Sequence, residues 1–511
     1  MSADTPAFGG SEPASAAAAV GTRPRLSAAG RVAALAVTAG IIGQLLFVGA
    51  SIGVNFPLAI LTALGAAVLA RRREARFDHA DWWLPASAVA LASFAALRGD
   101  PVLVFLDVVA SLCLMTASLA AIAGHRVTRR LLPGLAELAG RVLRSTLVSG
   151  GYVAADAAIA LRPGDGTRQR LAGARPILRG LLIALPMVIV FTALFASADA
   201  VFARIVGDLF RVDADLGELP GRVAVACAIA WVAAGALAFV AEDVPRADPV
   251  VGDRYRVLGS TEAVVVLIAV NAVFTVFVVL QAAYLFGGLD TLSASGQTYA
   301  EYARRGFFEL LAVAALAGGL ILIGEAIIRR RTRPYVGGAI GLMVLTAVVL
   351  ASAFLRLRIY QDAYGWTELR FYVLASIGWL AICLVMAIVA LWLDRSRWLV
   401  HGLVMAAVAV ALVINLVGPV RFVATQNLER AFNPALVPAD GWSGLDAAYA
   451  GTLGDDAVPL LAEALPQLPT VIRGYLEDQL ASRRADLARS EANTWQAWNL
   501  GREQAKAALD R

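Results

Sequence analysis

Charged residues, cysteines and histidines are scarce in this sequence. Asp, Glu, Lys and Arg together make up 16% of its 511 residues, whereas a soluble domain carries roughly 25%. The three cysteines and three histidines are far apart, without the spacing of a zinc or redox site. The sequence also lacks a phosphate-binding glycine loop and a nucleophile elbow. These absences argue against a metal centre and against nucleotide hydrolysis, and we expect no cofactor.

Apolar residues are abundant instead, at 59% of the chain. They occur in runs of about 17–23 residues, the length a helix needs to cross a hydrocarbon core of roughly 30 Å. We therefore predict an all-α fold, a polytopic transmembrane helix bundle of about 11 spans. Its expected partner is the lipid bilayer that surrounds it. The predicted spans are Val32–Gly49, Val54–Ala70, Trp82–Leu97, Pro101–Ala123, Gly180–Ala196, Val223–Val240, Ala263–Leu285, Phe307–Ile328, Tyr335–Leu355, Phe371–Leu393 and Trp398–Val420.

Arginine is unevenly distributed between the connections of these spans. If the N-terminus is cytoplasmic, the inner segments hold 26 arginines and the outer connections hold 9. Because arginine-rich connections stay in the cytoplasm, this division predicts an inner-membrane protein with a cytoplasmic N-terminus and an extracytoplasmic C-terminus. The excess of basic residues in the membrane part indicates topology, and we expect no nucleic-acid binding.

Four regions follow from composition and periodicity. Residues 1–30 are rich in Ala, Gly, Ser and Pro and are predicted to be a disordered cytoplasmic arm. Residues 31–420 form the transmembrane domain, with a cytoplasmic insert over 125–179 that contains a basic amphipathic helix. Residues 421–511 are polar and predict a small extracytoplasmic helical tail, with Trp495 and Trp498 as its anchors on the bundle.

Polar side chains gather in three segments that the topology places outside. The first precedes the span at 307, where Tyr302, Arg305 and Glu309 fall on one helical face. Glu309 lies inside an apolar run, so Arg305 is its expected ion-pair partner. The other two segments supply the remaining candidates. These are Asp199 and, on one helical face interrupted at Gly365, Tyr360, Tyr364 and Glu368. We expect these residues to form either a pocket for an anionic lipid or glycan head group or, for Arg305 and Glu309, an interhelical lock.

Ordinary membrane-interface roles are the alternative for these residues, because Tyr, Trp and Arg at helix ends also form aromatic belts and snorkelling anchors. Within the spans, Asp107 and Asn415 are the best candidates for an interhelical hydrogen bond.

Several motifs resemble a bacterial polytopic membrane family known only as a domain of unknown function (number 4173, related to 4153). The resemblance lies in Tyr299–Leu310, Ser197–Asp199 with Phe202, Tyr364–Arg370, and the tail elements Asn427–Ala431, Asp456–Pro459 and Trp498-Asn499. It implies a bacterial inner-membrane protein and brings no activity, ligand or catalytic residue.

Three functions are compatible with this sequence. The first is a non-enzymatic sensor or assembly protein that binds an envelope ligand or a protein partner of unknown identity, which the external tail favours. The second is a secondary transporter or channel, which an inverted repeat would support. The third is a membrane enzyme acting on a lipid-linked glycan, for which a large loop after the first span is expected; here that connection is only Ala50–Gly53. We favour the first and expect no catalytic residues.

Overall fold

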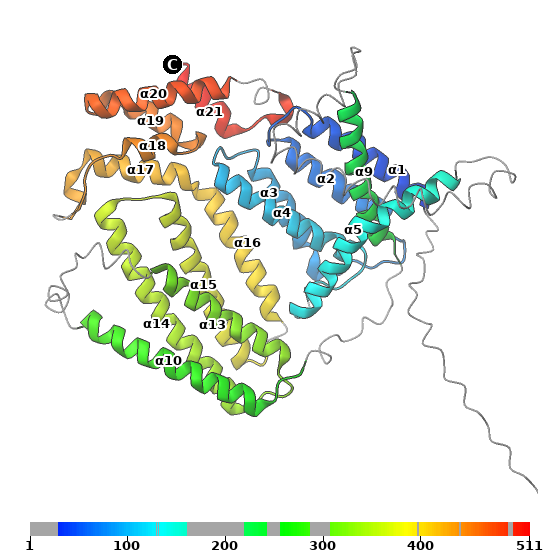
Figure 1. Cartoon of the computed structure of the whole chain (residues 1–511), viewed down its shortest axis with the longest axis horizontal. Helices are drawn as coiled ribbons and strands as arrows, with labels where there is room; N and C mark the ends of the chain where they lie inside the picture. Colours follow the sequence, from blue (N-terminus) through cyan, green and yellow to red (C-terminus); the bar gives the residue numbers. More distant parts are fainter. Residues whose placement is uncertain are drawn as a thin grey trace, which may run out of the picture.

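The computed structural model describes residues 29–128, 130, 132–160, 219–242, 256–286, 307–395, 398–438, 441–488 and 494–511. Within these ranges the regular structure is helical, as predicted (Figure 1). Eight of the described helices are long and apolar enough to cross a membrane. They are α1 (Ala29–Phe47), α4 (Pro101–Ile122), α9 (Leu219–Ala241), α10 (Ser260–Phe286), α13 (Phe307–Ile327), α14 (Arg333–Tyr364), α15 (Glu368–Trp392) and α16 (Leu399–Val417).

The remaining three predicted spans differ from these eight. Gly180–Ala196 lies outside the described residues. The helices α2 (Asn55–Ala70) and α3 (Trp83–Phe94) have 16 and 12 residues. At about 1.5 Å per residue, α3 extends about 18 Å and does not by itself match a hydrocarbon core of about 30 Å.

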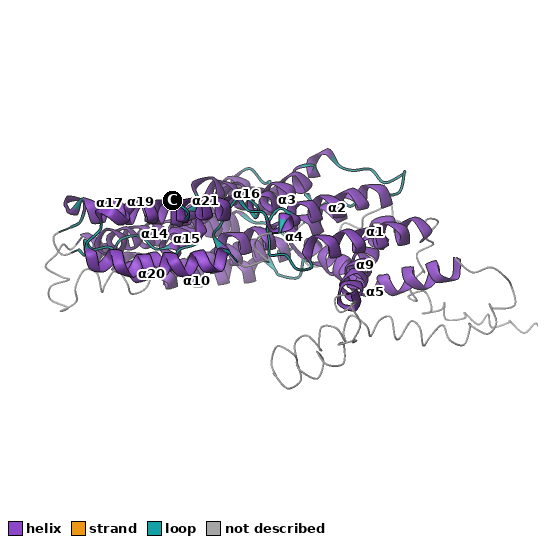
Figure 2. Cartoon of the chain, turned by 90° about the horizontal axis from the view of Figure 1, so that it is seen from above, coloured by secondary structure: helices purple, strands orange, loops and turns teal. Residues whose placement is uncertain are grey.

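The helices form two bundles, each with its own apolar core. The N-terminal bundle consists of α1, α2, α3, α4, α5 (Leu132–Ala160) and α9, and the C-terminal bundle of α10, α13, α14 and α15. Figures 1 and 2 show the two bundles side by side along the long axis of the molecule. Helix α16 lies between them, because Val408 and Ala411 pack against the first core and Leu399 belongs to the second.

A buried polar contact joins α16 to the N-terminal bundle. Asn415 Nδ2 donates to Asp107 Oδ1 at 2.7 Å, and both side chains are almost fully buried. Arg98 donates to the carbonyl oxygen of Asn415. The predicted interhelical bond is therefore confirmed, and contacts of this kind contribute about 0.6–2 kcal/mol within a membrane.

The short connections gather at two opposite ends of the bundles. At one end, here called the tail end, the turns at Gly53, Gly99 and Trp366 contact the C-terminal tail. At the opposite end, Arg331 forms ion pairs with Glu325 and Asp394. These five connections fall into the same two groups as in the arginine count, with Gly53, Gly99 and Trp366 at one end and Arg331 and Asp394 at the other.

The tail is helical, as predicted, and forms a layer across the ends of the bundle helices (Figure 1). Its helices are α17 (Pro419–Phe432), α18 (Ala447–Thr452), α19 (Val458–Ala464), α20 (Thr470–Leu487) and α21 (Leu500–Leu509). Helix α16 ends at Gly418, whose φ of 70° suits glycine, and Pro419 then begins α17 with a new direction. The side chain of Leu476 is fully buried in the tail's own apolar core.

Polar side chains dock the end of the tail on the N-terminal bundle. Asn499 Nδ2 donates to the carbonyl oxygens of Ala95 and Arg98, at 3.0 and 2.8 Å, and so caps the end of α3. Arg502 donates to Ser51 Oγ at 2.7 Å. The predicted tryptophan anchors were wrong, because the side chains of Trp495 and Trp498 are 61% and 44% exposed. This segment docks through its backbone and through Gln496 instead: Val54 N donates to Trp498 O at 3.0 Å, and Gln496 Nε2 donates to Leu45 O at 3.3 Å.

Two buried carboxyl groups lie where the tail docks on the N-terminal bundle. Asp456 Oδ1 accepts from Gly99 N at 2.9 Å, and Asp455 lies 3.5 Å from Arg483. Burial raises the pKa of both carboxyls above the ordinary value of 3.8, although Arg98, Arg483 and other nearby cations oppose the shift.

A carboxyl with a raised pKa binds its proton more tightly in the folded state, so its contribution to stability is lost as pH rises from 3.8 through the folded pKa. We therefore expect the thermal midpoint of the solubilised protein to fall over this range. Asp456→Asn, which keeps a hydrogen-bond acceptor, is expected to flatten the dependence. A midpoint that rises with pH in the wild type and is unchanged in the variant would contradict the assignment.

Candidate binding site at the tail end

The turn between α14 and α15 forms one wall of the candidate site. Helix α14 continues past the predicted end of its span to Tyr364 and stops at Gly365, whose φ is 80°. Thr367 then begins α15 by accepting a hydrogen bond from Arg370 N at 3.3 Å. A left-handed glycine followed by a threonine N-cap is the sequence signal for such a turn.

Asn427 of α17 holds this turn against the tail. Its Oδ1 accepts from Trp366 N and its Nδ2 donates to Trp366 O, both at 2.8 Å. The Trp366 ring is mostly buried and packs edge-on against Phe422, with ring centroids 4.8 Å apart. One amide therefore satisfies both backbone groups of Trp366 and links the C-terminal bundle to the tail.

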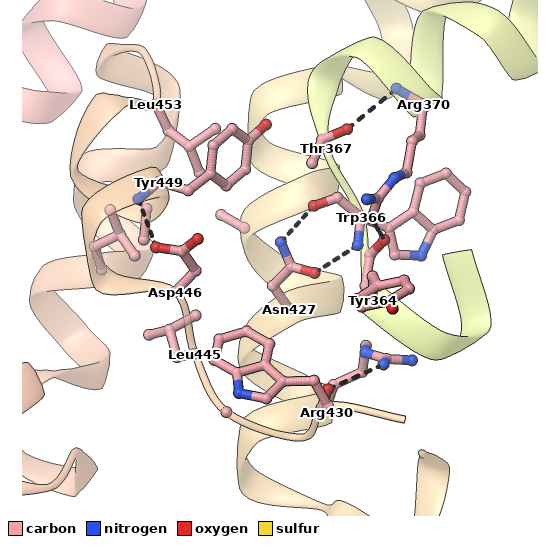
Figure 3. Close-up of a pocket in the computed structure, with 16 residues that line it drawn as sticks. Tyr364, Trp366, Thr367, Arg370, Asn427, Arg430, Leu445, Asp446, Tyr449 and Leu453 are labelled. Atoms are coloured by element: carbon pink, nitrogen blue, oxygen red, sulfur yellow. Dashed lines mark hydrogen bonds between the residues drawn. The ribbon is translucent and has the colours of Figure 1, made fainter. Parts of the chain in front are cut away.

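A cavity of about 270 Å³ lies between this turn and α18, with α17 as its floor (Figure 3). Figure 3 shows Trp366, Thr367 and Arg370 on one side and Asp446, Tyr449 and Leu453 on the other. The cavity is therefore built jointly by the membrane bundle and the tail. Its lining combines aromatic rings with cationic and amide groups, which is the usual composition of a site for a polar ligand.

Two arginines supply the positive charge of the cavity. Arg370 donates to Gly365 O, and its guanidinium carbon lies 4.1 Å from the centre of the Tyr360 ring. Arg430 Nη2 lies 3.4 Å from Trp442 O. Burial lowers the pKa of Arg430, but an arginine remains charged at neutral pH. Two fixed guanidinium groups favour an anionic ligand.

The tail wall carries a carboxylate and a phenol that are already engaged. Asp446 accepts from Tyr449 N at 3.0 Å and so caps α18. The Tyr449 hydroxyl accepts from Glu368 N at 2.7 Å, and burial raises its pKa to about 12. Both groups hold the wall in place through these hydrogen bonds. The geometry is suited to binding rather than to proton transfer.

The structure brings together only some of the residues predicted from sequence. Tyr360 and Tyr364 are adjacent, with ring centroids 5.1 Å apart, and Tyr364 lines the cavity. Glu368 does not continue their helical face, because Gly365 ends α14, and it instead contacts Tyr449 through its backbone. Glu309 is exposed in the first turn of α13. Asp199, Tyr302 and Arg305 lie outside the described residues, so the Arg305–Glu309 pair stays a prediction.

Sequence reasoning missed most of the tail's contribution. Asn427 and Arg430 stood out only through the family resemblance, and Trp442 and Tyr449 were not singled out. Asp446 carried a usable signal, because an aspartate before Ala447–Thr452 is a helix N-cap. Which face of the bundle the tail covers was not readable from local patterns.

These features define a polytopic helical membrane protein with a polar cavity between its bundle and a C-terminal helical layer. The chain belongs to a family described as a domain of unknown function (DUF4153), whose family model matches residues 85–464. The related family 4173, which the sequence resembles, is likewise of unknown function. The prediction that the chain belongs to a family of unknown function is therefore confirmed. No curated protein and no solved structure matches the chain. The cavity lies wholly within the matched region, whereas α20 and α21 lie beyond it.

Proposed function

We propose that this protein is a non-enzymatic membrane protein that binds an anionic glycan or lipid head group in the tail-end cavity, on the extracytoplasmic side of a bacterial inner membrane. The arginine distribution supports this orientation, with the N-terminus in the cytoplasm. Ligand binding would then serve sensing or assembly in the cell envelope.

One observation carries the proposal: the walls of the cavity come from two parts of the chain, the membrane bundle and the tail. Arg370 comes from α15 in the membrane bundle, and Arg430 comes from α17 in the tail. An anion held by both guanidinium groups would bridge the two parts. Because a ligand shifts the equilibrium toward the state it binds better, occupancy would stabilise the docked tail.

The aromatic lining favours a sugar-like or head-group ligand over a bare inorganic ion. Trp366, Trp442, Tyr364 and Tyr449 all line the cavity. Flat rings of this kind pack on the apolar faces of a bound molecule while arginine fixes its charged group.

Calorimetric titration of the solubilised full chain with a hexose 1-phosphate, against the neutral hexose, tests the proposal. We expect binding of the phosphate compound alone, and an affinity lowered roughly tenfold in Arg430→Gln, because a charge-assisted hydrogen bond contributes about 1.5–3 kcal/mol. Arg421→Gln is the matched control, since Arg421 is exposed on the same helix and does not line the cavity.

The same titration in sealed vesicles tests the orientation. Right-side-out vesicles are expected to bind the probe and inverted vesicles are not. In the calorimetric titration, equal affinities for the neutral hexose and the hexose 1-phosphate would refute the site. Equal losses of affinity in Arg430→Gln and Arg421→Gln would refute it as well. Binding confined to inverted vesicles would refute only the orientation.

A further inference from the structure

A second cavity lies at the end opposite the tail, where α3 and α4 face α16. Its volume is about 310 Å³, and it lies between the N-terminal bundle and α16. Most of its lining is apolar, from Leu91, Leu114, Ala117, Val404 and Ala407. These walls belong to helices that span the membrane or pack between spans, so the medium around the cavity is lipid.

Polar groups in this cavity are concentrated where the chain leaves α4. Thr128 lines the cavity and is 4% exposed, and its Oγ1 has no hydrogen-bond partner among the described residues. The indole Nε1 of Trp83 is buried in the lining and is also without a partner within the described ranges. Leaving a buried hydroxyl or indole N–H unsatisfied costs about 1–3 kcal/mol, which indicates an absent acceptor.

The charge of this polar group is positive. Arg130 lines the cavity beside Thr128, with its Nε donating to Arg126 O at 2.9 Å, and the described residues of the lining include no aspartate or glutamate. A neighbouring acid, Asp81, is fully buried and accepts from the backbone N–H groups of Val127 and Thr128, at 3.2 and 3.0 Å. Its charge is thus used to fix the loop that presents the Thr128 hydroxyl. The cavity offers hydrogen-bond donors and a cation to whatever enters it.

Two tryptophans flank this polar end. The ring of His401 lies 5.3 Å from that of Trp83 and 5.9 Å from that of Trp398, centroid to centroid. Tryptophan is enriched at the level of lipid head groups. The polar end of the cavity therefore lies where a head group would be found, and the apolar part extends from it toward the membrane interior.

We propose that this groove binds one anionic phospholipid, with an acyl chain between α4 and α16 and its phosphodiester at Thr128, Trp83 and Arg130. The apolar walls complement the chain, and the donors complement the phosphate oxygens. This site is separate from the tail-end cavity, and its occupant comes from the bilayer. A lipid bound there would fill the space between α16 and the N-terminal bundle.

Native mass spectrometry of the full chain tests this proposal. The protein is reconstituted in bilayers of equimolar phosphatidylglycerol and phosphatidylcholine with identical acyl chains and then extracted into mild detergent. We expect the wild type to retain one phosphatidylglycerol molecule. A phosphatidylglycerol with a photoreactive acyl chain is expected to label peptides that contain Val404–Ala411.

Two matched pairs of variants separate the chain site from the head-group site. Ala407→Phe fills the groove and is expected to lower retention of both lipids about fivefold. Ala409→Phe is the control, because Ala409 is exposed on the same helix and does not line the groove, and it is expected to leave retention unchanged. Thr128→Val removes the hydroxyl at constant volume and is expected to reduce retention of phosphatidylglycerol roughly tenfold, because that hydroxyl is assigned to a phosphate oxygen of the head group. Thr116→Val is its control, because that hydroxyl already donates to Leu112 O at 2.8 Å.

Equal retention of the two phospholipids by the wild type would overturn the head-group assignment. If lipid retention and photolabelling are unchanged in Ala407→Phe, or if only detergent occupies the groove, the assignment of the groove as an acyl-chain site is wrong. If Ala407→Phe does not fold, Ala117→Leu on the facing wall is measured in its place with the same expectation.

Discussion

Gly365→Ala is expected to lower the free energy of unfolding by about 2–4 kcal/mol. A non-glycine residue in this region of backbone space costs about 1–3 kcal/mol, and Gly365 has φ 80° and ψ −170°. A Cβ atom there would also lie 2.9 Å from Asn427 Oδ1. The substitution therefore strains the turn and disturbs the pair of hydrogen bonds to Trp366, each contributing about 1 kcal/mol.

Gly378→Ala is the matched control for this measurement. Gly378 lies within α15, and a Cβ atom there has nothing within 4 Å. Alanine in a helix interior is about 0.5–1 kcal/mol more favourable than glycine. Denaturant or thermal unfolding of both variants in detergent gives the comparison. Equal stabilities of the two variants would show that the turn is not constrained as described.

The α14–α15 turn also bears on the proposed function. Gly365, Trp366 and Arg370 all line the tail-end cavity, so Gly365→Ala is expected to weaken binding of the hexose 1-phosphate together with stability. Arg430→Gln, in contrast, is expected to weaken binding more than stability. The two outcomes distinguish a residue that shapes the cavity from one that contacts the ligand.

The membrane fold was readable from sequence because its signal is local. Runs such as Pro101–Ile122 are long, apolar and flanked by helix signals, here Asp100 as N-cap and Pro101 in the first turn. The buried pair of Asp107 and Asn415 could also be anticipated, because isolated polar residues in apolar runs form hydrogen bonds between helices.

The candidate site was only partly readable, because it depends on contacts distant in sequence. Trp366 and Asn427 are separated by 61 positions, and no local pattern pairs them. The same holds for the docking of Asn499 on Ala95, 404 positions away. Their size predicts that the tryptophans beside Asn499 are anchors, whereas docking is achieved by hydrogen bonds and by glycines that let backbones approach.

Gly501→Ala is expected to release the end of the tail from the N-terminal bundle. A Cβ atom at Gly501 would overlap Asp456 Oδ1 and lie 2.9 Å from Gly99 Cα. Neither neighbour is the free end of a flexible side chain, because Asp456 is itself bonded to Gly99 N. Overpacking of this kind costs about 1–3 kcal/mol, and displacement of α21 also removes the hydrogen bonds of Asn499, each contributing about 1 kcal/mol.

Limited proteolysis measures this release. Cleavage before α21 is expected to be about tenfold faster in the variant, because 1.4 kcal/mol corresponds to a tenfold change in the fraction of molecules with α21 undocked. Gly474→Ala is the control, because Gly474 lies in α20 and a Cβ atom added there would have nothing within 4 Å. Binding of the hexose 1-phosphate is expected to survive in Gly501→Ala, since the cavity is walled by α17 and α18 and not by α21. Unchanged cleavage would show that α21 accommodates the methyl group. Loss of binding together with release would instead mean that the tail docks and undocks as one unit.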